Sequence, residues 1–231
     1  MFILFLQSPV LYSAGSINDL REPLEYIHTK YCKTSDLYLI GNSMGANIVA
    51  NYVGEEGARC FLKAACCVQA PMKMCHFGEN LEKRFFGVYN YGLGRMIKAK
   101  MEVVAPNIKE AYLENHGIDV DEALRKSRHL IDIETHMTSI AFGYKTFDNY
   151  YDKASCHHRI PLINTPTFFL NARDDPIIGE QAIDREACEK NTYCLLGTTR
   201  RGGHLGYFES VTSSRQWFTQ PVFEFLNYFQ S

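Results

Sequence analysis

The hydrophobic pattern of this 231-residue chain contains four short apolar runs. The first is followed by a helical pattern and the last by a glycine-rich loop. Runs of this length, rich in apolar and β-branched residues, are typical of buried strands. The first run leads into the helical pattern of 46–53, and such alternation of strand and helix is typical of α/β proteins. We therefore predict an α/β fold with a mostly parallel sheet flanked by helices. The four runs are 36–40, 61–68, 166–171 and 193–196.

The middle of the chain has a different pattern. Between residues 72 and 162 the strand runs stop and helical patterns remain, among them 107–115 and 119–129. An insertion of helices between strands suits a cap that shapes a substrate pocket. We therefore expect a sheet-containing core at 1–71 and 163–231 and a helical cap or insertion at 72–162.

A G-x-S-x-G motif lies between the first strand run and the first helical pattern. Its residues are Gly41-Asn42-Ser43-Met44-Gly45. This motif places a reactive serine on a strained strand-to-helix turn, and glycines on both sides let strand and helix approach closely. We therefore predict that Ser43 is a nucleophile and that both Gly41 and Gly45 are needed for close packing.

A serine nucleophile of this kind needs an acid and a histidine later in the chain. The strand run 166–171 leads into Asp174-Asp175-Pro176, which places an acid at the end of a strand. Both aspartates are candidates, and the proline after Asp175 favours Asp175 because it turns the chain away from the sheet. The alternative is that the two aspartates only end the strand and cap a turn.

The candidate base is His204. It follows the strand run 193–196 through Gly202-Gly203, in a loop flexible enough to bring an imidazole to the serine. The alternative is a surface-loop histidine without a catalytic role.

These motifs, together with Tyr150-Tyr151 and Gly202-Gly203-His204-Leu205-Gly206-Tyr207, resemble the YheT-like, embryogenesis-associated branch of the α/β-hydrolases, an abhydrolase-domain family. The resemblance extends from about residue 8 to the C-terminus. It implies an α/β-hydrolase fold with a helical cap insertion. It also implies hydrolysis of carboxylic esters, of lipid or short-chain type, with Asp175 as the acid.

The resemblance implies that the N-terminal strands are missing. The family's fold has four strands and a helix before the nucleophile strand, whereas only 35 residues precede Asp36. The early loop that resembles the source of one oxyanion amide is missing too, so the Met44 backbone N–H is the predicted oxyanion donor. Losing one such donor lowers the rate by about two to three orders of magnitude.

We expect acyl transfer to water through Ser43, Asp175 and His204. No cofactor is expected, because protein groups supply the nucleophile, the base and the oxyanion donor. The alternative is a non-catalytic remnant that binds a lipid or a partner protein, which the missing loop favours. A third reading is that another chain supplies the missing half, and the oligomeric state is left open.

Composition narrows the choice of partners. The net charge is −2 and the basic residues are scattered apart from Arg200-Arg201, which excludes a nucleic-acid footprint. The expected partner is a small-molecule ester or lipid, with membrane contact through the lipid substrate only. The pair His157-His158 is expected to bind no metal.

The cysteines and the N-terminus bear on location. The eight cysteines follow no zinc-binding spacing and are predicted to be buried, reduced thiols of a cytoplasmic protein. The apolar segment 1–6 is too short for a signal peptide or a membrane span, while an anchor in a missing N-terminus is a further reading.

Overall fold

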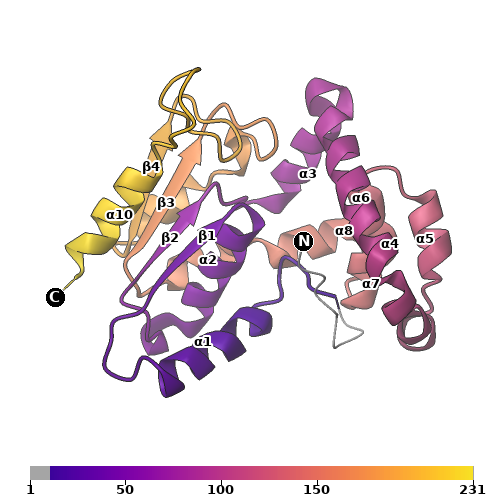
Figure 1. Cartoon of the computed structure of the whole chain (residues 1–231), viewed down its shortest axis with the longest axis horizontal. Helices are drawn as coiled ribbons and strands as arrows, with labels where there is room; N and C mark the ends of the chain where they lie inside the picture. The colour runs from indigo at the N-terminus through magenta and orange to yellow at the C-terminus, as the bar shows by residue number, and fades with distance from the viewer. Residues whose placement is uncertain (1–10, 231) are drawn as a thin grey trace. The chain divides into compact units, whose positions relative to one another are not determined.

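The computed structural model describes residues 11–230, which form two compact units (Figure 1). Among these residues the sheet unit consists of 14–80 and 154–230, and the helical unit of 11–13 and 81–153. The division into a core and a substrate-shaping cap stays a prediction.

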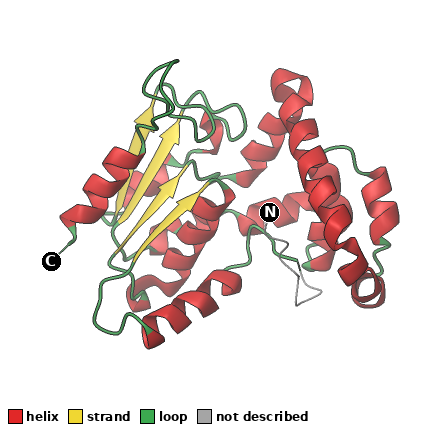
Figure 2. Ribbon diagram, viewed as in Figure 1, coloured by secondary structure: helices red, strands yellow, loops and turns green. Residues whose placement is uncertain are grey.

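The sheet unit is built on four parallel strands in the order β1-β2-β3-β4 (Figure 2). The strands are β1 (Tyr38–Asn42), β2 (Ala64–Val68), β3 (Thr167–Ala172) and β4 (Cys194–Thr199). Each predicted apolar run contains or overlaps one of them. The parallel sheet flanked by helices confirms the α/β class.

The positions of the strands in the sheet explain their composition. Strands β2 and β3 have neighbours on both sides and every residue of both is buried, which suits their near-continuous apolar sequence. Strand β1 pairs with β2 alone among the described residues, and Ile40 on it is exposed.

Helices cover both faces of this sheet. On one face α2 (Met44–Glu56) packs on Ala65 and Cys67 of β2, and on the other α10 (Thr219–Tyr228) packs on Cys66. Alternate residues of one strand therefore enter different cores, as the two-residue period of a strand requires. Two further α-helices lie wholly in this unit, α1 (Asn18–Lys30) and α9 (Arg185–Lys190).

The helical unit is organised around the long helix α4 (Val88–His116). The predicted helix at 107–115 is the last part of this element, which begins much earlier than expected. It ends at Gly117, whose φ of 67° is the left-handed conformation that glycine adopts at helix ends. The other helices that lie wholly or partly in this unit are α3 (Met74–Lys83), α5 (Val120–Lys126), α6 (Leu130–Ile133), α7 (Ser139–Ala141) and α8 (Phe147–Ala154).

A carboxylic acid is enclosed within the helical unit. Glu134 begins a π-helical turn, Glu134–Thr138, and its Oε2 accepts a hydrogen bond from the hydroxyl of the fully buried Tyr151. Burial of the carboxyl group raises the pKa of Glu134 to about 7, against the smaller opposing effect of the tyrosine hydrogen bond. The folded chain therefore keeps a proton on Glu134 at pH values where the unfolded chain has lost it.

This proton predicts that stability falls with rising pH. Between the ordinary glutamate pKa near 4.5 and the folded value of about 7, the folded state binds more protons, so the free energy of unfolding decreases. The contribution of Glu134 is up to about 3 kcal/mol. Urea unfolding followed by circular dichroism at pH 4.5 to 8 should show Glu134→Gln gaining stability relative to the native chain as pH rises. A constant difference between the two would contradict the assignment.

The cysteines correct one prediction. All eight are free thiols, and Cys66, Cys67, Cys156 and Cys188 are buried, where burial raises their pKa. Cys75, however, is exposed on the amphipathic helix α3, and the prediction of burial is wrong for it. The half-buried ones are Cys32, Cys60 and Cys194.

Within residues 11–230, every helix is either too short or too polar to cross a membrane.

Candidate active site

Ser43 occupies the turn between β1 and α2. Its φ of 53° and ψ of −124° lie outside the regions that non-glycine residues favour, and such strain clusters at functional sites. The Ser43 backbone N–H donates to the Val68 carbonyl of the neighbouring strand at 2.9 Å, while its own carbonyl accepts the first bonds of α2, from Ala46 and Asn47. Strand and helix thus hold the strained residue from both sides.

The two glycines of the motif have different roles. A Cβ atom on Gly41 would lie 2.5 Å from the Gly45 carbonyl oxygen and 2.8 Å from the Ala46 Cα, so strand and helix approach there as predicted. A Cβ on Gly45 would have no described atom within 4 Å, which corrects the expectation that both glycines are needed for packing. A side chain at position 45 would therefore extend into open space.

This difference predicts opposite effects of two alanine substitutions. Gly41→Ala must displace backbone atoms and is expected to lower the free energy of unfolding by about 2–3 kcal/mol. Gly45→Ala adds a methyl group to an open position near the start of a helix and is expected to be neutral or to stabilise by up to about 1 kcal/mol. Urea unfolding of both variants measures this, and equal destabilisation would contradict the packing argument.

Asp175 is buried at the turn after β3. Its Oδ1 accepts hydrogen bonds from the backbone N–H groups of Ile177 at 2.7 Å and Ile178 at 3.0 Å. Its Oδ2 accepts from the Gln69 side-chain amide at 2.7 Å and lies 2.8 Å from Nδ1 of His204. Because all these groups meet it from fixed positions, the carboxylate has one defined orientation.

Asp174, the alternative acid, has another contact. Its Oδ1 accepts a hydrogen bond from the Gly203 backbone N–H at 2.9 Å. It therefore fastens the loop before His204 and has no contact with the imidazole among the hydrogen bonds of the described chain.

His204 lies between Asp175 and the serine. Its Nε2 is 2.9 Å from Oγ of Ser43, and its Nδ1 faces the carboxylate. A carboxylate accepts hydrogen bonds, so it assigns the imidazole proton to Nδ1 and leaves Nε2 to accept the serine proton. The structure thus brings together all three side chains singled out in the sequence.

The fourth predicted group is the Met44 backbone N–H. Met44 is the first residue of the 13-residue helix α2. The first N–H groups of a helix have no partner within it, and the positive end of the helix dipole favours a negative charge there. Such an N–H, adjacent to Ser43, is suited to bind a negatively charged oxygen of a group that becomes attached to the serine.

Gln69 belongs to the same hydrogen-bond network and was missed in the sequence. It follows the last residue of β2 and is fully buried. The sequence signal that could have revealed it is a glutamine directly after a buried apolar strand, because a buried side-chain amide needs hydrogen-bond partners. The neighbouring strands end near the candidate catalytic residues, which could supply such partners.

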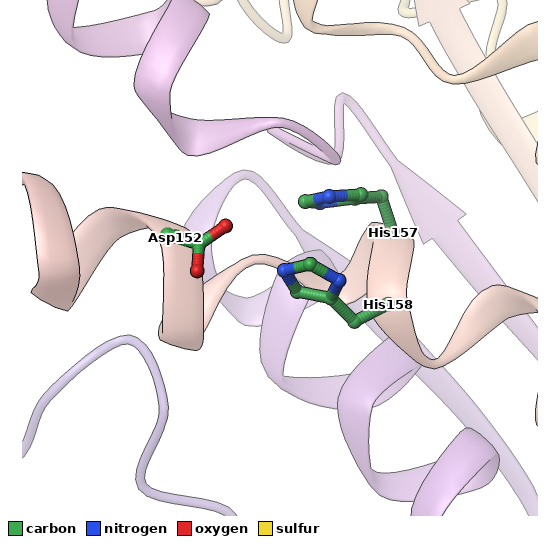
Figure 3. A group of neighbouring side chains, drawn as sticks. All are labelled: Asp152, His157 and His158. Carbon is green, nitrogen blue, oxygen red and sulfur yellow. The ribbon is translucent and has the colours of Figure 1, made fainter.

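The histidine pair is shown with Asp152 in Figure 3. His157 and His158 belong to one 3-10 turn of the sheet unit, Cys156–His158, and their ring centroids are 3.8 Å apart. Partial burial, and then the neighbouring His158, lower the pKa of His157. Asp152 is a residue of α8 in the helical unit. The expectation that this pair binds no metal stays a prediction.

Comparison with known proteins identifies the family. The sequence model of the alpha/beta hydrolase fold matches residues 7–211. The chain belongs to the α/β-hydrolase family. This confirms the resemblance seen in its motifs.

Relatives in this family include a monoacylglycerol lipase of Saccharomyces cerevisiae, 33% identical over 97% of this chain and 49% of that protein. The embryogenesis-associated protein EMB8 of Picea glauca is 27% identical over 95% of this chain and 48% of that protein. The chain thus spans about half the length of the curated relatives it matches. Among solved structures, an esterase of Pyrococcus furiosus matches with a TM-score of 0.54 at 15% identity, over 97% of this chain and 65% of that one, which supports the fold.

Proposed function

We propose that this chain carries the catalytic machinery of a serine hydrolase that cleaves carboxylic esters. The observation that carries the proposal is the position of His204, with Nε2 at 2.9 Å from the Ser43 hydroxyl and Nδ1 at 2.8 Å from the Asp175 carboxylate. Both distances are within hydrogen-bond reach, which is the geometry of a nucleophile, its base and the group that orients the base.

In the first half-reaction, Oγ of Ser43 attacks the ester carbonyl carbon while Nε2 of His204 takes the hydroxyl proton. The tetrahedral intermediate then expels the alcohol oxygen, which receives that proton from Nε2. An acyl group remains on Ser43. In the second half-reaction, water gives a proton to Nε2 and attacks the acyl carbon, and the serine regains its proton as the carboxylic acid leaves.

Asp175 supports both half-reactions. Its carboxylate holds the imidazole in the tautomer that leaves Nε2 free to accept, and it stabilises the positive charge on His204 after proton transfer. Because Asp175 is buried, water does not screen this interaction strongly.

The Met44 N–H is the proposed oxyanion donor of this chain. The carbonyl oxygen of the substrate becomes negative when Ser43 attacks, and the N-terminus of α2 is adjacent to that point. An oxyanion site normally has two donors, and we propose the Met44 N–H as one of them.

The proposed substrates are esters of fatty acids. The relative from Saccharomyces cerevisiae is named a monoacylglycerol lipase, which supports a lipid ester over a peptide. The triad chemistry needs no metal or organic cofactor, and we propose that the chain uses none.

The test is release of fatty acid from 1-monooleoylglycerol, with p-nitrophenyl esters of two to sixteen carbons as a second series. We expect turnover by the native chain and none by His204→Gln, which keeps the fold but lacks the base. Release at the buffer rate by both proteins would contradict the proposal. Binding of monooleoylglycerol without release would instead support the non-catalytic lipid-binding alternative.

A further inference from the structure

Gln69 occupies an unusual position for a long polar side chain. It is fully buried, and its φ of 54° lies in the left-handed region that few residues other than glycine and asparagine adopt. Its backbone N–H donates to the Leu170 carbonyl at 2.8 Å, which continues the ladder between β2 and β3. The backbone thus turns sharply at the sheet end that carries the acid and the histidine loop.

The side-chain amide of Gln69 connects three segments. Its Nε2 donates to Oδ2 of Asp175 at 2.7 Å and to the Gly203 carbonyl at 2.6 Å. Its Oε1 accepts a hydrogen bond from the Ala172 backbone N–H at 2.6 Å. This set of partners fixes the orientation of the amide, because a flipped amide would turn an oxygen toward two acceptors and an NH₂ group toward a donor.

Both amide protons are directed at the proposed catalytic machinery. One reaches the carboxylate oxygen that faces His204, and the other holds the carbonyl of the residue directly before His204. The loop is fastened on its other side by Asp174, whose carboxylate accepts from the Gly203 N–H. Without Gln69, Gly203 keeps the hydrogen bond that its N–H donates to Asp174 and loses the one that its carbonyl accepts. Oδ2 of Asp175 keeps its contact with His204, but the carboxylate is held less firmly in position.

We propose that Gln69 is the positioning residue of this site: its amide clamps the Asp175 carboxylate and the His204 loop in the geometry that activates Ser43. The effect of this clamp on the reactivity of Ser43 rests on the proposed function. The clamp itself is a property of the loop and is measurable without turnover.

The test uses two variants and one matched control in the whole chain. Gln69→Asn keeps an amide and suits the left-handed backbone, but it is one methylene too short to hold both partners. Gln69→Met keeps the length and volume without the hydrogen bonds. The control is Asn171→Leu, which removes a buried amide of β3 that donates to the Ala70 carbonyl at 3.1 Å and contacts neither clamp partner.

The first readout is hydrogen exchange of the backbone amides of residues 202–207. Loss of one hydrogen bond that holds the loop is expected to raise their exchange about fivefold or more in both Gln69 variants. The strand amides of 167–171 should keep their native rates, whereas the Ala172 N–H, which donates to Oε1 of Gln69, loses its acceptor in Gln69→Met and is left out of this reference set. The control should leave exchange in the histidine loop unchanged, and unchanged loop exchange in both Gln69 variants would overturn the proposal.

The second readout is the rate at which a fluorophosphonate labels Ser43. Misplacement of the base is expected to lower this rate about 10- to 100-fold in the Gln69 variants, with the control near the native rate. A native chain that takes no label would refute the proposed function, while loop exchange would still decide the clamp. Faster loop exchange with native labelling rates would overturn the positioning role.

Discussion

Replacing Ser43 with alanine is expected to lower hydrolysis of monooleoylglycerol by about five to six orders of magnitude. The nucleophile and its base act as one unit, so removing either loses nearly the whole contribution of the triad. The fold should survive, because alanine keeps the backbone bonds from the Ser43 N–H to Val68 and from Ala46 to the residue 43 carbonyl. Fatty-acid release and urea unfolding on the same preparation measure both effects.

The matched control is Ser155→Ala in the same unit. Ser155 is fully buried, and its Oγ accepts a hydrogen bond from the Met74 backbone N–H at 2.8 Å. Its loss is expected to cost about 1–2 kcal/mol of stability and to leave turnover within a few-fold of native. Equal turnover by Ser43→Ala and the native chain would remove Ser43 from the reaction.

Asparagine at position 175 is expected to lower kcat by about 10⁴-fold. The amide keeps one oxygen for the Ile177 and Ile178 N–H groups, so its NH₂ is directed at Nδ1 of His204. Facing a donor, the imidazole must carry its proton on Nε2, where it cannot accept the serine proton. The catalytic base is lost, and the Gln69 amide loses its acceptor at Oδ2 as well.

Asp174→Asn separates the two candidate acids. Its side-chain oxygen still accepts the hydrogen bond from the Gly203 N–H, so we expect kcat within about threefold of native. Steady-state kinetics of the two variants on a p-nitrophenyl ester decide between them. A large loss in Asp174→Asn with native kcat in Asp175→Asn would reverse the assignment.

Much of the sheet unit could be predicted because its signals are local. The strand runs owe their composition to burial on both faces, and the G-x-S-x-G motif reports the tight turn at Ser43 through the contact at Gly41. The boundaries were less accurate. The run 36–40 became Tyr38–Asn42, since strand ends depend on pairing with β2 and not on composition.

The choice between Asp174 and Asp175 needed three-dimensional information. Both follow the same strand, and only the turn geometry places one carboxylate against the imidazole and the other against a backbone amide. Gln69 was missed for the same reason, because its partners lie more than a hundred positions away in the sequence. Hydrophobic periodicity carries no information on such contacts.

The helical unit was predicted in kind but not in length. Pro106 lies inside α4, where a proline normally marks a helix end, and only the part after it, 107–115, was predicted as a helix. The helix continues because contacts with its neighbours, such as Ile108 and Tyr112 in the core of this unit, stabilise it as one element. Tertiary packing thus outweighed local propensity.

The most direct test of the catalytic proposal is the site of covalent modification by a fluorophosphonate. The whole chain is labelled at neutral pH, digested, and the modified residue identified by mass spectrometry. The account predicts a single adduct on Ser43, formed by the native chain and absent from His204→Gln, since only a serine activated by its base reacts at this rate. An adduct on another residue, or a native chain that takes no label under conditions where a control serine hydrolase is fully modified, would contradict it.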